Sequence, residues 1–577
     1  MAAQCPQQAG ITHCFVNLGS DHPSILEAIV QGQNSKSGFP RIITCPNEMV
    51  ALSMADGYAR LTNKPQCVIV HVDVGTSGMG AAVHNASIGR APVLIFAGLS
   101  PFTMEGESRG SRTEFIHWLQ DVPDQKQIVA QYCRYVGEIK SAKNIKQVVG
   151  RALQFACSDP QGPAYLMGAR EIMEEEIQPY DLQQEHWNPV GSGALPADSL
   201  ESIAKLLLDA KEPLIICGYT GRNHAAVTAL VRLADTIKGI RVLDTGGSDM
   251  CFPADHPAWL GFRYGSDESI KTADVILVLD CDVPFINTQC KPNASAKMIH
   301  IDVDPLKTII PLFYLPAVYR YRADSQTAMT QLTEYISQHP SHSETIASPE
   351  FTERWTKLQE SHKARVLGIA KLAVPRSDNA ISASHMARTV RNLCPPDTIF
   401  AVEAVTNAIL VSDQIQATQP GQWIHCGGGG LGWSGGGALG IKMATDALEG
   451  AGKGKMVVQI VGDGSYLFSV PSSVYWISRR YQIPILTIVL NNRGWNAPRR
   501  SMLLVHPDGL GSRSTNDDLN IAFEPSPNYP GIARAASGDS IHAARVADAK
   551  DLESVMKEAI AVVLSGTTAV VEVAIAV

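Results

Sequence analysis

Two stretches of the chain decide the fold of its C-terminal third: VVQIVGDGSYLF at residues 457–468 and ILTIVLNN at residues 485–492. Each opens with apolar, mostly β-branched residues, which is typical of a strand buried on both faces of a parallel sheet. The first strand ends in Gly-Asp-Gly-Ser and the second in Asn-Asn, with a helix-forming stretch between them. Two strands joined in this way predict a βαβ unit.

Polar side chains follow both strands, at the ends where a parallel sheet binds ligands. Asp463 and Asn492 are 29 residues apart, and the carboxyl ends of neighbouring strands meet at one edge of the sheet. Mg²⁺ takes oxygen ligands, often with phosphate oxygens completing its shell. Gly464 lets the backbone approach a diphosphate, and we expect Ser465 to open a helix whose N-terminus favours anions. The alternative is an ordinary strand–turn–helix in which Asp463 only caps the helix.

The same alternation of strand and helix recurs along all 577 residues, a length that exceeds a single hydrophobic core. We predict an α/β fold of three doubly wound parallel-sheet domains at residues 1–182, 198–340 and 375–577. Polar stretches at 183–200 and 338–348 separate them. The predicted strands are 14–18, 67–72, 93–96, 164–167, 214–217, 241–243, 275–279, 298–301, 399–402, 457–461, 485–490 and 569–573.

Composition excludes several classes of protein. With 45% hydrophobic and 18% charged residues the chain is a compact globular protein, neither disordered nor fibrous. A net charge of -8 without basic clusters argues against nucleic acid. The longest apolar runs are too short to span a membrane, and no signal or transit peptide is visible, so we expect a cytoplasmic protein. The twelve cysteines form no CxxC pair, which argues against disulfides and zinc.

The segment from Gly-Asp-Gly to Asn-Asn resembles the cofactor signature of the thiamine-diphosphate enzymes of the acetolactate synthase, benzoylformate decarboxylase and pyruvate decarboxylase superfamily. The resemblance covers nearly the whole chain. It implies thiamine diphosphate and Mg²⁺ as cofactors, with pyrimidine-binding, middle and diphosphate-binding domains in that order. It also implies that Asp463, Asn492 and the main-chain carbonyl of Gly494 hold the metal. The residues expected around the cofactor in this segment are Gly462, Asp463, Gly464, Ser465, Asn492, Gly494 and Trp495.

The N-terminal domain carries a second part of the resemblance. Pro46-Asn47-Glu48, followed by ADGYAR at residues 55–60, is similar to the family's glutamate helix. By this match the Glu48 carboxylate hydrogen-bonds the aminopyrimidine ring of the cofactor and favours the imino tautomer that activates it. In the family this glutamate and the diphosphate site belong to different subunits. The resemblance therefore implies a homodimer, or a dimer of dimers, with the active site at the subunit interface.

A glycine-rich run, GGGGLGWS at residues 427–434, carries the third part. By resemblance Leu431 lies between the two rings of the cofactor and holds it in a bent conformation. The same run satisfies the GxGxxG pattern of dinucleotide-binding sites. We do not favour that interpretation, because no strand is predicted directly before the run.

The stretch CVIVHVDVGTSGMG at residues 67–80 is most similar to benzoylformate decarboxylase, in which a histidine stands where His71 does. The match implies proton transfer by His71 and binding of a substrate carboxylate at Ser20. Gln120 resembles a pocket residue of acetolactate synthases. Residues 280–287 lack the decarboxylase's second histidine, and the partners needed for FAD near 299–305 are not recognisable. Further candidates for the pocket are His22, His84 and His117.

Together these features imply a lyase or carboligase acting on a 2-oxo acid or a 2-hydroxy ketone. In the family, decarboxylation gives an enamine that is protonated or captured by a second carbonyl. The alternatives are an acetolactate synthase proper and a catalytically silent paralogue that serves as a regulatory or scaffold subunit. A silent copy would be expected to lose Glu48 or a metal ligand, and this chain keeps Glu48, Asp463 and Asn492. An NAD-dependent dehydrogenase lacks a credible fingerprint.

Overall fold

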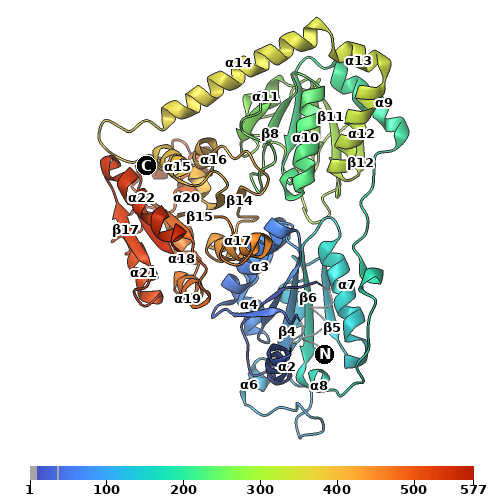
Figure 1. Cartoon of the computed structure of the whole chain (residues 1–577), viewed down its shortest axis with the longest axis vertical. Coiled ribbons are helices and arrows are strands. Elements are labelled where there is room, and N and C mark those ends of the chain that lie inside the picture. The colour runs from blue at the N-terminus through green and yellow to red at the C-terminus, as the bar shows by residue number, and fades with distance from the viewer. Residues whose placement is uncertain (1–9, 36–37, 577) are drawn as a thin grey trace.

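The computed structural model describes residues 10–35 and 38–576 and contains three six-stranded sheets with helices packed against them (Figure 1). Every pair of neighbouring strands in the described sheets is parallel. The predicted α/β fold of three parallel-sheet domains is confirmed. Runs of Val, Ile and Leu such as VILVL at 275–279 form the central strands, because both faces of these sheets are buried.

The first and third sheets share one strand order. In the first the order is β2-β1-β3-β4-β6-β5, and in the third it is β14-β13-β15-β16-β18-β17, which is the same order when each sheet is numbered from its own start. The first sheet consists of β1 (His13–Val16), β2 (Arg41–Thr44), β3 (Gln66–Val70), β4 (Val93–Leu99), β5 (Tyr135–Ile139) and β6 (Pro163–Ala169). The third consists of β13 (Ile399–Glu403), β14 (Trp423–His425), β15 (Val457–Gly462), β16 (Leu486–Asn491), β17 (His542–Val546) and β18 (Ala569–Ala574).

The middle sheet has a different order, β12-β11-β10-β7-β8-β9. Counted from its own start and read in the reverse direction, this is 3-2-1-4-5-6, the order of dinucleotide-binding domains. Its strands are β7 (Pro213–Cys217), β8 (Arg241–Asp244), β9 (Trp259–Phe262), β10 (Val275–Leu279), β11 (Lys297–Asp302) and β12 (Tyr319–Arg322).

Helices connect the strands of each sheet (Figure 1). The first domain contains α2 (Pro23–Asn34), α3 (Glu48–Thr62), α4 (Val74–Gly78), α5 (Gly80–Ile88), α6 (Ile116–Leu119), α7 (Ile145–Cys157) and α8 (Arg170–Met173). The middle domain contains α9 (Ala197–Asp209), α10 (His224–Thr236), α11 (Glu268–Thr272), α12 (Ser325–Gln338) and α13 (Pro340–Ile346). The third contains α15 (Ala383–Leu393), α16 (Ala408–Ile415), α17 (Trp433–Glu449), α18 (Asp463–Phe468), α19 (Pro471–Tyr481), α20 (Asn496–Val505), α21 (Tyr529–Ala536) and α22 (Ala549–Leu564).

The connection between the middle and third domains differs from the expected polar linker. The polar stretch 338–348 includes α13, and it is followed by the 24-residue helix α14 (Pro349–Leu372), which runs along the outside of the molecule (Figure 1). Only Phe351, Leu358 and Ile369 of α14 are buried. Its apolar stripe is therefore narrow, which explains why composition alone did not indicate a helix.

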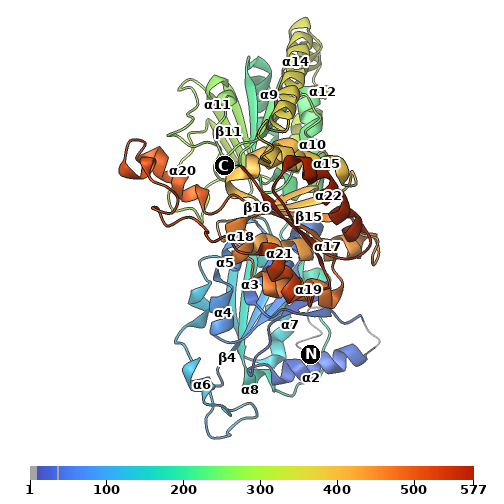
Figure 2. The ribbon, with the colours of Figure 1, turned by 90° about the vertical axis from the view of Figure 1, so that its left-hand side faces the viewer.

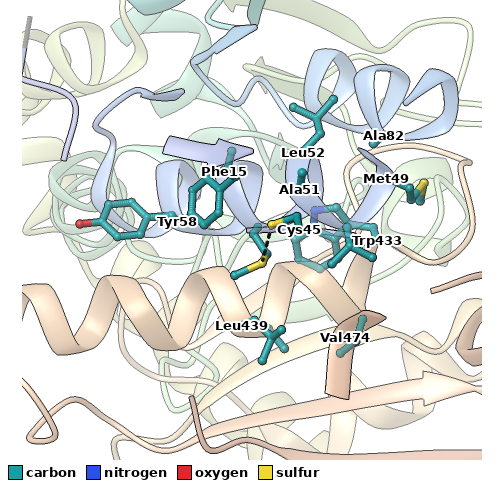
Figure 3. Packing of buried hydrophobic residues seen from close by; sticks show 14 of the residues in the cluster. Phe15, Cys45, Met49, Ala51, Leu52, Tyr58, Ala82, Trp433, Leu439 and Val474 are labelled. Atoms are coloured by element: carbon teal, nitrogen blue, oxygen red, sulfur yellow. Dashed lines mark hydrogen bonds between the residues drawn. The ribbon is translucent and has the colours of Figure 1, made fainter. Parts of the chain in front are cut away.

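Helices α3 and α17 form the contact that joins the first and third domains (Figure 3). Every residue from Met49 to Leu61 in α3 is buried. Glycines on α17 allow the close approach: an added Cβ at Gly440 would lie 2.0 Å from the Met54 carbonyl oxygen, and one at Gly436 would lie 2.7 Å from the Val50 carbonyl oxygen. The backbones of the two helices are thus in direct contact.

Arg60, near the end of α3, joins all three domains. The side chain is 1% exposed. Its Nη1 donates to the His425 carbonyl oxygen at 2.6 Å, and its Nη2 donates to the Ser248 carbonyl oxygen at 2.6 Å and to Asp249 Oδ2 at 3.0 Å. The ring of Trp433 lies 5.4 Å from the guanidinium carbon. A single cation with a buried counter-ion thus binds the middle and third domains to α3.

None of the helices within residues 10–35 and 38–576 combines the length and the apolar character needed to cross a membrane.

The glycine contact gives a first prediction. We expect Gly440→Ala to lower the midpoint of thermal unfolding and to destabilise the chain by about 1–3 kcal/mol, because the new methyl group would overlap the backbone of α3. Gly368→Ala is the matched control, since Gly368 also lies in a helix, α14, and has no atom within 4 Å of the added Cβ. The control should be neutral or slightly stabilising. Equal effects of the two changes would contradict the close helix contact.

Candidate active site

The strand order of the third sheet reverses between β13 and β15, and parallel sheets bind ligands in the crevice at such a point. β14 lies on one side of β13 and β15 on the other, so the chain leaves the carboxyl ends of β13 and β15 in opposite directions. Asp463 follows β15 directly and is 3% exposed. Its Oδ1 accepts a hydrogen bond from the Gly464 amide at 2.8 Å, and its Oδ2 accepts one from the Gly494 amide at 2.8 Å. The carboxylate thus joins the turn after β15 to the turn after β16.

Three oxygen-bearing groups converge beside this carboxylate. One atom of the Asn492 side-chain amide lies 3.3 Å from each Asp463 carboxylate oxygen and 2.8 Å from the Gly494 carbonyl oxygen. If this atom is the amide nitrogen, it donates hydrogen bonds to the Asp463 and Gly494 oxygens. If it is the amide oxygen, the neighbouring oxygens need a cation between them. The described residues contain no cluster of three or more His, Cys, Asp or Glu side chains that could hold a metal. A cation at this point would depend on Asp463, one amide and one carbonyl.

Burial raises the pKa of Asp463 to about 6. The backbone amides that donate to its carboxylate stabilise the charged form and oppose this rise. No Lys or Arg of the described residues forms an ion pair with it. A buried carboxylate of this kind gains from a divalent cation, because the cation offsets the loss of hydration. The donor set therefore fits Mg²⁺, which favours carboxylate and carbonyl oxygens.

The residues next to the metal ligands lie partly as expected. Gly462 ends β15, and α18 begins at Asp463, so the prediction that Ser465 opens the helix is wrong by two residues. Trp495 packs on this turn, because an added Cβ at Gly464 would lie 2.5 Å from its Nε1. The Trp495 ring also packs edge-on against Phe523 at 5.0 Å and remains 37% exposed.

The glycine-rich run lies between β14 and α17. The prediction that no strand directly precedes it is wrong: β14 does, but it is a three-residue strand at the edge of the sheet and not beside the crevice. Asn85 of α5 binds the run, accepting from the Gly430 amide at 3.0 Å and donating to the Gly430 carbonyl oxygen at 2.7 Å. His84 Nε2 accepts from the Gly429 amide at 3.0 Å. Leu431 follows this anchored loop and is half-buried.

Glu403 is a site residue that sequence reasoning missed. It ends β13 and is 1% exposed. Its carboxylate accepts from the Gly432 amide at 2.7 Å and from the Ser434 amide at 2.8 Å, so it holds the start of α17 next to the crevice. Burial raises its pKa to about 7. The available signal was an acidic residue at the end of a predicted buried strand.

The strand order of the first sheet also reverses, between β1 and β3, so the same rule places a ligand crevice there. His71 follows β3, and its Nδ1 is hydrogen-bonded to Asp21 Oδ1. The other Asp21 oxygen accepts from the Val72 amide at 3.0 Å. Two glycines leave the space that the Asp21 and His71 side chains occupy. An added Cβ at Gly19 would lie 1.9 Å from His71 Nδ1, and one at Gly98 would lie 1.7 Å from Asp21 Oδ2.

Asp21, which the sequence analysis did not single out, controls His71. The hydrogen bond that His71 donates to Asp21 is the main cause that raises the pKa of His71, burial opposes it, and the charges of Asp21 and Glu48 add to the rise. On the other side of the ring, His71 Nε2 lies 2.8 Å from the Gln120 Nε2 amide. Gln120 is buried, and its Oε1 has no hydrogen-bond partner among the described residues. Rotating this amide would offer an acceptor to a protonated His71.

The remaining predicted residues of the first domain surround this pair. Ser20 Oγ lies 3.4 Å from His117 Nε2, so Ser20, His71, Gln120 and His117 gather at one sheet edge. His22 lies behind them, with Nδ1 accepting from the Gly19 amide at 3.2 Å. His84 does not line this crevice but supports the glycine-rich run.

Glu48 is the first residue of α3, and the side chain of Asn47 caps the helix by accepting from the Val50 amide at 3.2 Å. Its carboxylate is half-buried beside α4, where an added Cβ at Gly78 would lie 2.9 Å from Glu48 Oε2. Among residues 10–35 and 38–576 no hydrogen bond or ion pair engages this carboxylate, and none joins it to the Gly-Asp-Gly turn.

Comparison with known proteins agrees with this arrangement. Residues 1–128 match the family described as thiamine pyrophosphate enzyme, N-terminal TPP binding domain. Residues 200–310 match its central domain, and residues 404–573 match its C-terminal TPP binding domain. The chain belongs to the thiamine-diphosphate enzymes. The N-terminal match contains Ser20 and His71, and the C-terminal match contains Asp463 and Asn492.

Individual relatives of this thiamine-diphosphate enzyme are distant. It is 24% identical to benzoylformate decarboxylase of Pseudomonas aeruginosa, over 96% of this chain and 94% of the relative. It is 23% identical to the large subunit of acetolactate synthase isozyme 3 of Escherichia coli, over 92% of this chain and 87% of the relative. A solved structure of 4-hydroxybenzoylformate decarboxylase from Rhodococcus jostii is 20% identical, covers 100% of this chain and 98% of its own, and superposes with a TM-score of 0.77.

A second prediction concerns the Asp21–His71 pair of this enzyme. We expect Asp21→Asn to lower the pKa of His71, because the change removes the group that chiefly raises it. The pair stabilises the fold below the pKa that His71 has when unfolded, and this contribution is lost as the pH rises through the folded pKa. The stability difference between wild type and variant should therefore be largest at acid pH.

Titration of ¹³C-labelled histidines and unfolding at several pH values measure these two effects. Asp124→Asn is the control, since Asp124 forms an ion pair with Lys126 and does not contact His71. A His71 titration midpoint that stays unchanged in Asp21→Asn would show that the pair does not set the protonation of His71.

Proposed function

We propose that this chain is a thiamine-diphosphate- and Mg²⁺-dependent lyase or carboligase that acts on a 2-oxo acid or a 2-hydroxy ketone. The observation that carries the proposal is the convergence of the Asp463 carboxylate, the Asn492 amide and the Gly494 carbonyl at the crevice of the third sheet. When bound, thiamine diphosphate supplies an electron sink for the bond next to a carbonyl carbon. Retention of the metal-ligand set and of Glu48 argues against a silent paralogue.

The third domain would hold the cofactor's diphosphate. Asp463, Asn492 and the carbonyl of Gly494 would bind the Mg²⁺ ion that neutralises it. Leu431 would support the cofactor from the loop that Asn85 and Glu403 fix in place. These residues bind and orient, and a fixed loop loses little entropy when the cofactor binds.

The first domain would supply the groups that move protons. Glu48 has a carboxylate without a hydrogen bond or ion pair among the described residues and would exchange a proton with the aminopyrimidine of the cofactor. His71 would exchange a proton with the substrate through Nε2, while Asp21 holds Nδ1 and so fixes the orientation of the ring. Gln120 contacts the same nitrogen and would favour either protonation state by rotating its amide.

The two halves of the site would meet in a homodimer. Exposed apolar side chains flank both halves: Phe115 is 76% and Leu119 68% exposed beside Gln120, and Leu504 is 70% and Val505 67% exposed on α20, the helix that follows the metal loop. Helix α20 projects from the body of the chain and buries none of its residues (Figure 2). Apolar surface on both sides supports association with a second copy.

A third prediction tests the role of Glu48. We expect Glu48→Gln to lower kcat by about 10²–10⁴-fold with pyruvate or benzoylformate, because the amide cannot exchange the required proton. Glu27→Gln on the exposed face of α2 removes the same charge and should leave kcat unchanged. Product analysis by mass spectrometry measures both, and ligand released from the purified protein identifies the cofactor. Equal turnover by Glu48→Gln and wild type would remove Glu48 from the mechanism.

A fourth prediction tests the shared site. Glu48→Gln and Asp463→Ala should each be inactive alone. Unfolded together and refolded as a 1:1 mixture, they should recover about a quarter of the wild-type activity, because half of the dimers are mixed and each mixed dimer has one intact site. Recovery of no activity, in a mixture shown to contain mixed dimers, would place both residues of each site on one chain.

A further inference from the structure

Arg170 lies at the first-domain crevice and has no role in the function proposed above. It follows β6, begins α8 and is 8% exposed. Its Nη1 lies 3.4 Å from Ser20 O and 3.4 Å from His117 Nε2. The guanidinium therefore lies directly beside two of the predicted pocket residues.

The hydrogen bonds of Arg170 are weak for a buried cation. Besides the two contacts above, Nη1 donates to Thr113 Oγ1 at 3.2 Å and Nη2 donates to Ser111 O at 3.4 Å. All four partners are neutral and lie farther away than the 2.7–2.9 Å that is usual for charge-assisted bonds. The buried Nε has no partner among the described residues.

Arg170 also lacks a counter-ion. Within residues 10–35 and 38–576 no carboxylate forms an ion pair with it, whereas Arg60 pairs with Asp249 at 3.0 Å and Arg90 pairs with Asp282 at 3.0 Å. The nearby carboxylates form their hydrogen bonds elsewhere, although Glu171 Oε2 is buried without a hydrogen-bond partner among the described residues. Asp21 binds His71 and the Val72 amide, Glu171 Oε1 accepts from Thr103 at 2.6 Å, and Glu174 binds Ser24 and Arg109. A buried guanidinium without a negative partner is unfavourable unless a ligand supplies one.

Hydrogen-bond donors outnumber acceptors around His117. The Thr113 amide donates to Nδ1 at 3.4 Å, while Arg170 Nη1 and the Ser20 hydroxyl both lie 3.4 Å from Nε2. Burial and the charge of Arg170 lower the pKa of His117, which favours the neutral ring, and a neutral ring accepts at only one nitrogen. A neutral ring cannot accept from all three of these groups, and a bound carboxylate would supply further lone pairs to Arg170 and Ser20.

We propose that Arg170 is a specificity-determining residue that binds the carboxylate of the substrate, together with the Ser20 hydroxyl. This inference rests on the proposed function and narrows it, because the site would select 2-oxo acids over neutral ketones and aldehydes. Ser20, and the backbone that joins it to Asp21, place the bound carboxylate next to the His71 pair.

Kinetics with charged and neutral substrates test the proposal. We expect Arg170→Gln to raise KM for pyruvate or benzoylformate by about 10- to 100-fold, because the variant loses one pair of charge-assisted hydrogen bonds to the substrate carboxylate. The change in kcat should be smaller. Carboligation of benzaldehyde, which has no charge, should change by less than about threefold. Arg170→Lys should recover part of the affinity. Arg109→Gln, whose side chain is 77% exposed in the same domain, is the matched control.

Binding without turnover provides a second arm. We expect phenylacetate to raise the unfolding midpoint of wild type and of Arg109→Gln, and not that of Arg170→Gln, while phenylacetamide stabilises none of them. Equal loss of charged and neutral turnover in Arg170→Gln, or a wild type that phenylacetate does not stabilise, would overturn the proposal. A wild type that turns over none of these substrates refutes the proposed function, and the binding arm then still decides the role of Arg170.

Discussion

The contact between helices α3 and α17 fixes the geometry on which the candidate site depends. Glu48 is the first residue of α3, and Leu431 and Gly432 lead directly into α17, so this contact sets how far apart one chain holds its acid and its cofactor-supporting loop. In the proposed homodimer these two groups belong to different sites, and the contact fixes the spacing of the sites. Larger side chains at Gly436 and Gly440 would separate the backbones. Small residues at a helix interface therefore determine where an acid and a cofactor-supporting loop are placed.

The first and third domains use one topology for two kinds of chemistry. In both, the strand order reverses between the first and third strands of the sheet, and the polar residues follow those strands. In the third domain the crevice collects oxygen donors around Asp463, which suit a cation. In the first it collects His71, Asp21 and Arg170, which suit proton exchange and an anion. The backbone gives the position of each site, and the side chains after the strands give its function.

Sequence reasoning found all twelve central strands and missed six, and the six are the edge strands of the three sheets. β5 and β12 are half-exposed and lack an apolar run. β9 is buried and β14 largely so, but they are only four and three residues long. The site shows the same limit. Asp463 and Asn492 follow central strands and could be predicted. Glu403 ends a central strand as well, so its position carried a signal that was overlooked. Asp21 and Arg170 could not be predicted, because their partners are distant in the sequence.

The junction at Arg60 restricts how this chain can move. Its guanidinium binds groups of the middle and third domains from a helix of the first, with 1% of its surface exposed. A hinge motion between any two of these domains would separate the buried Arg60 guanidinium from its hydrogen-bond partners. The three domains of the chain therefore move as one rigid block, and in the proposed homodimer a ligand would enter or leave where the two copies meet.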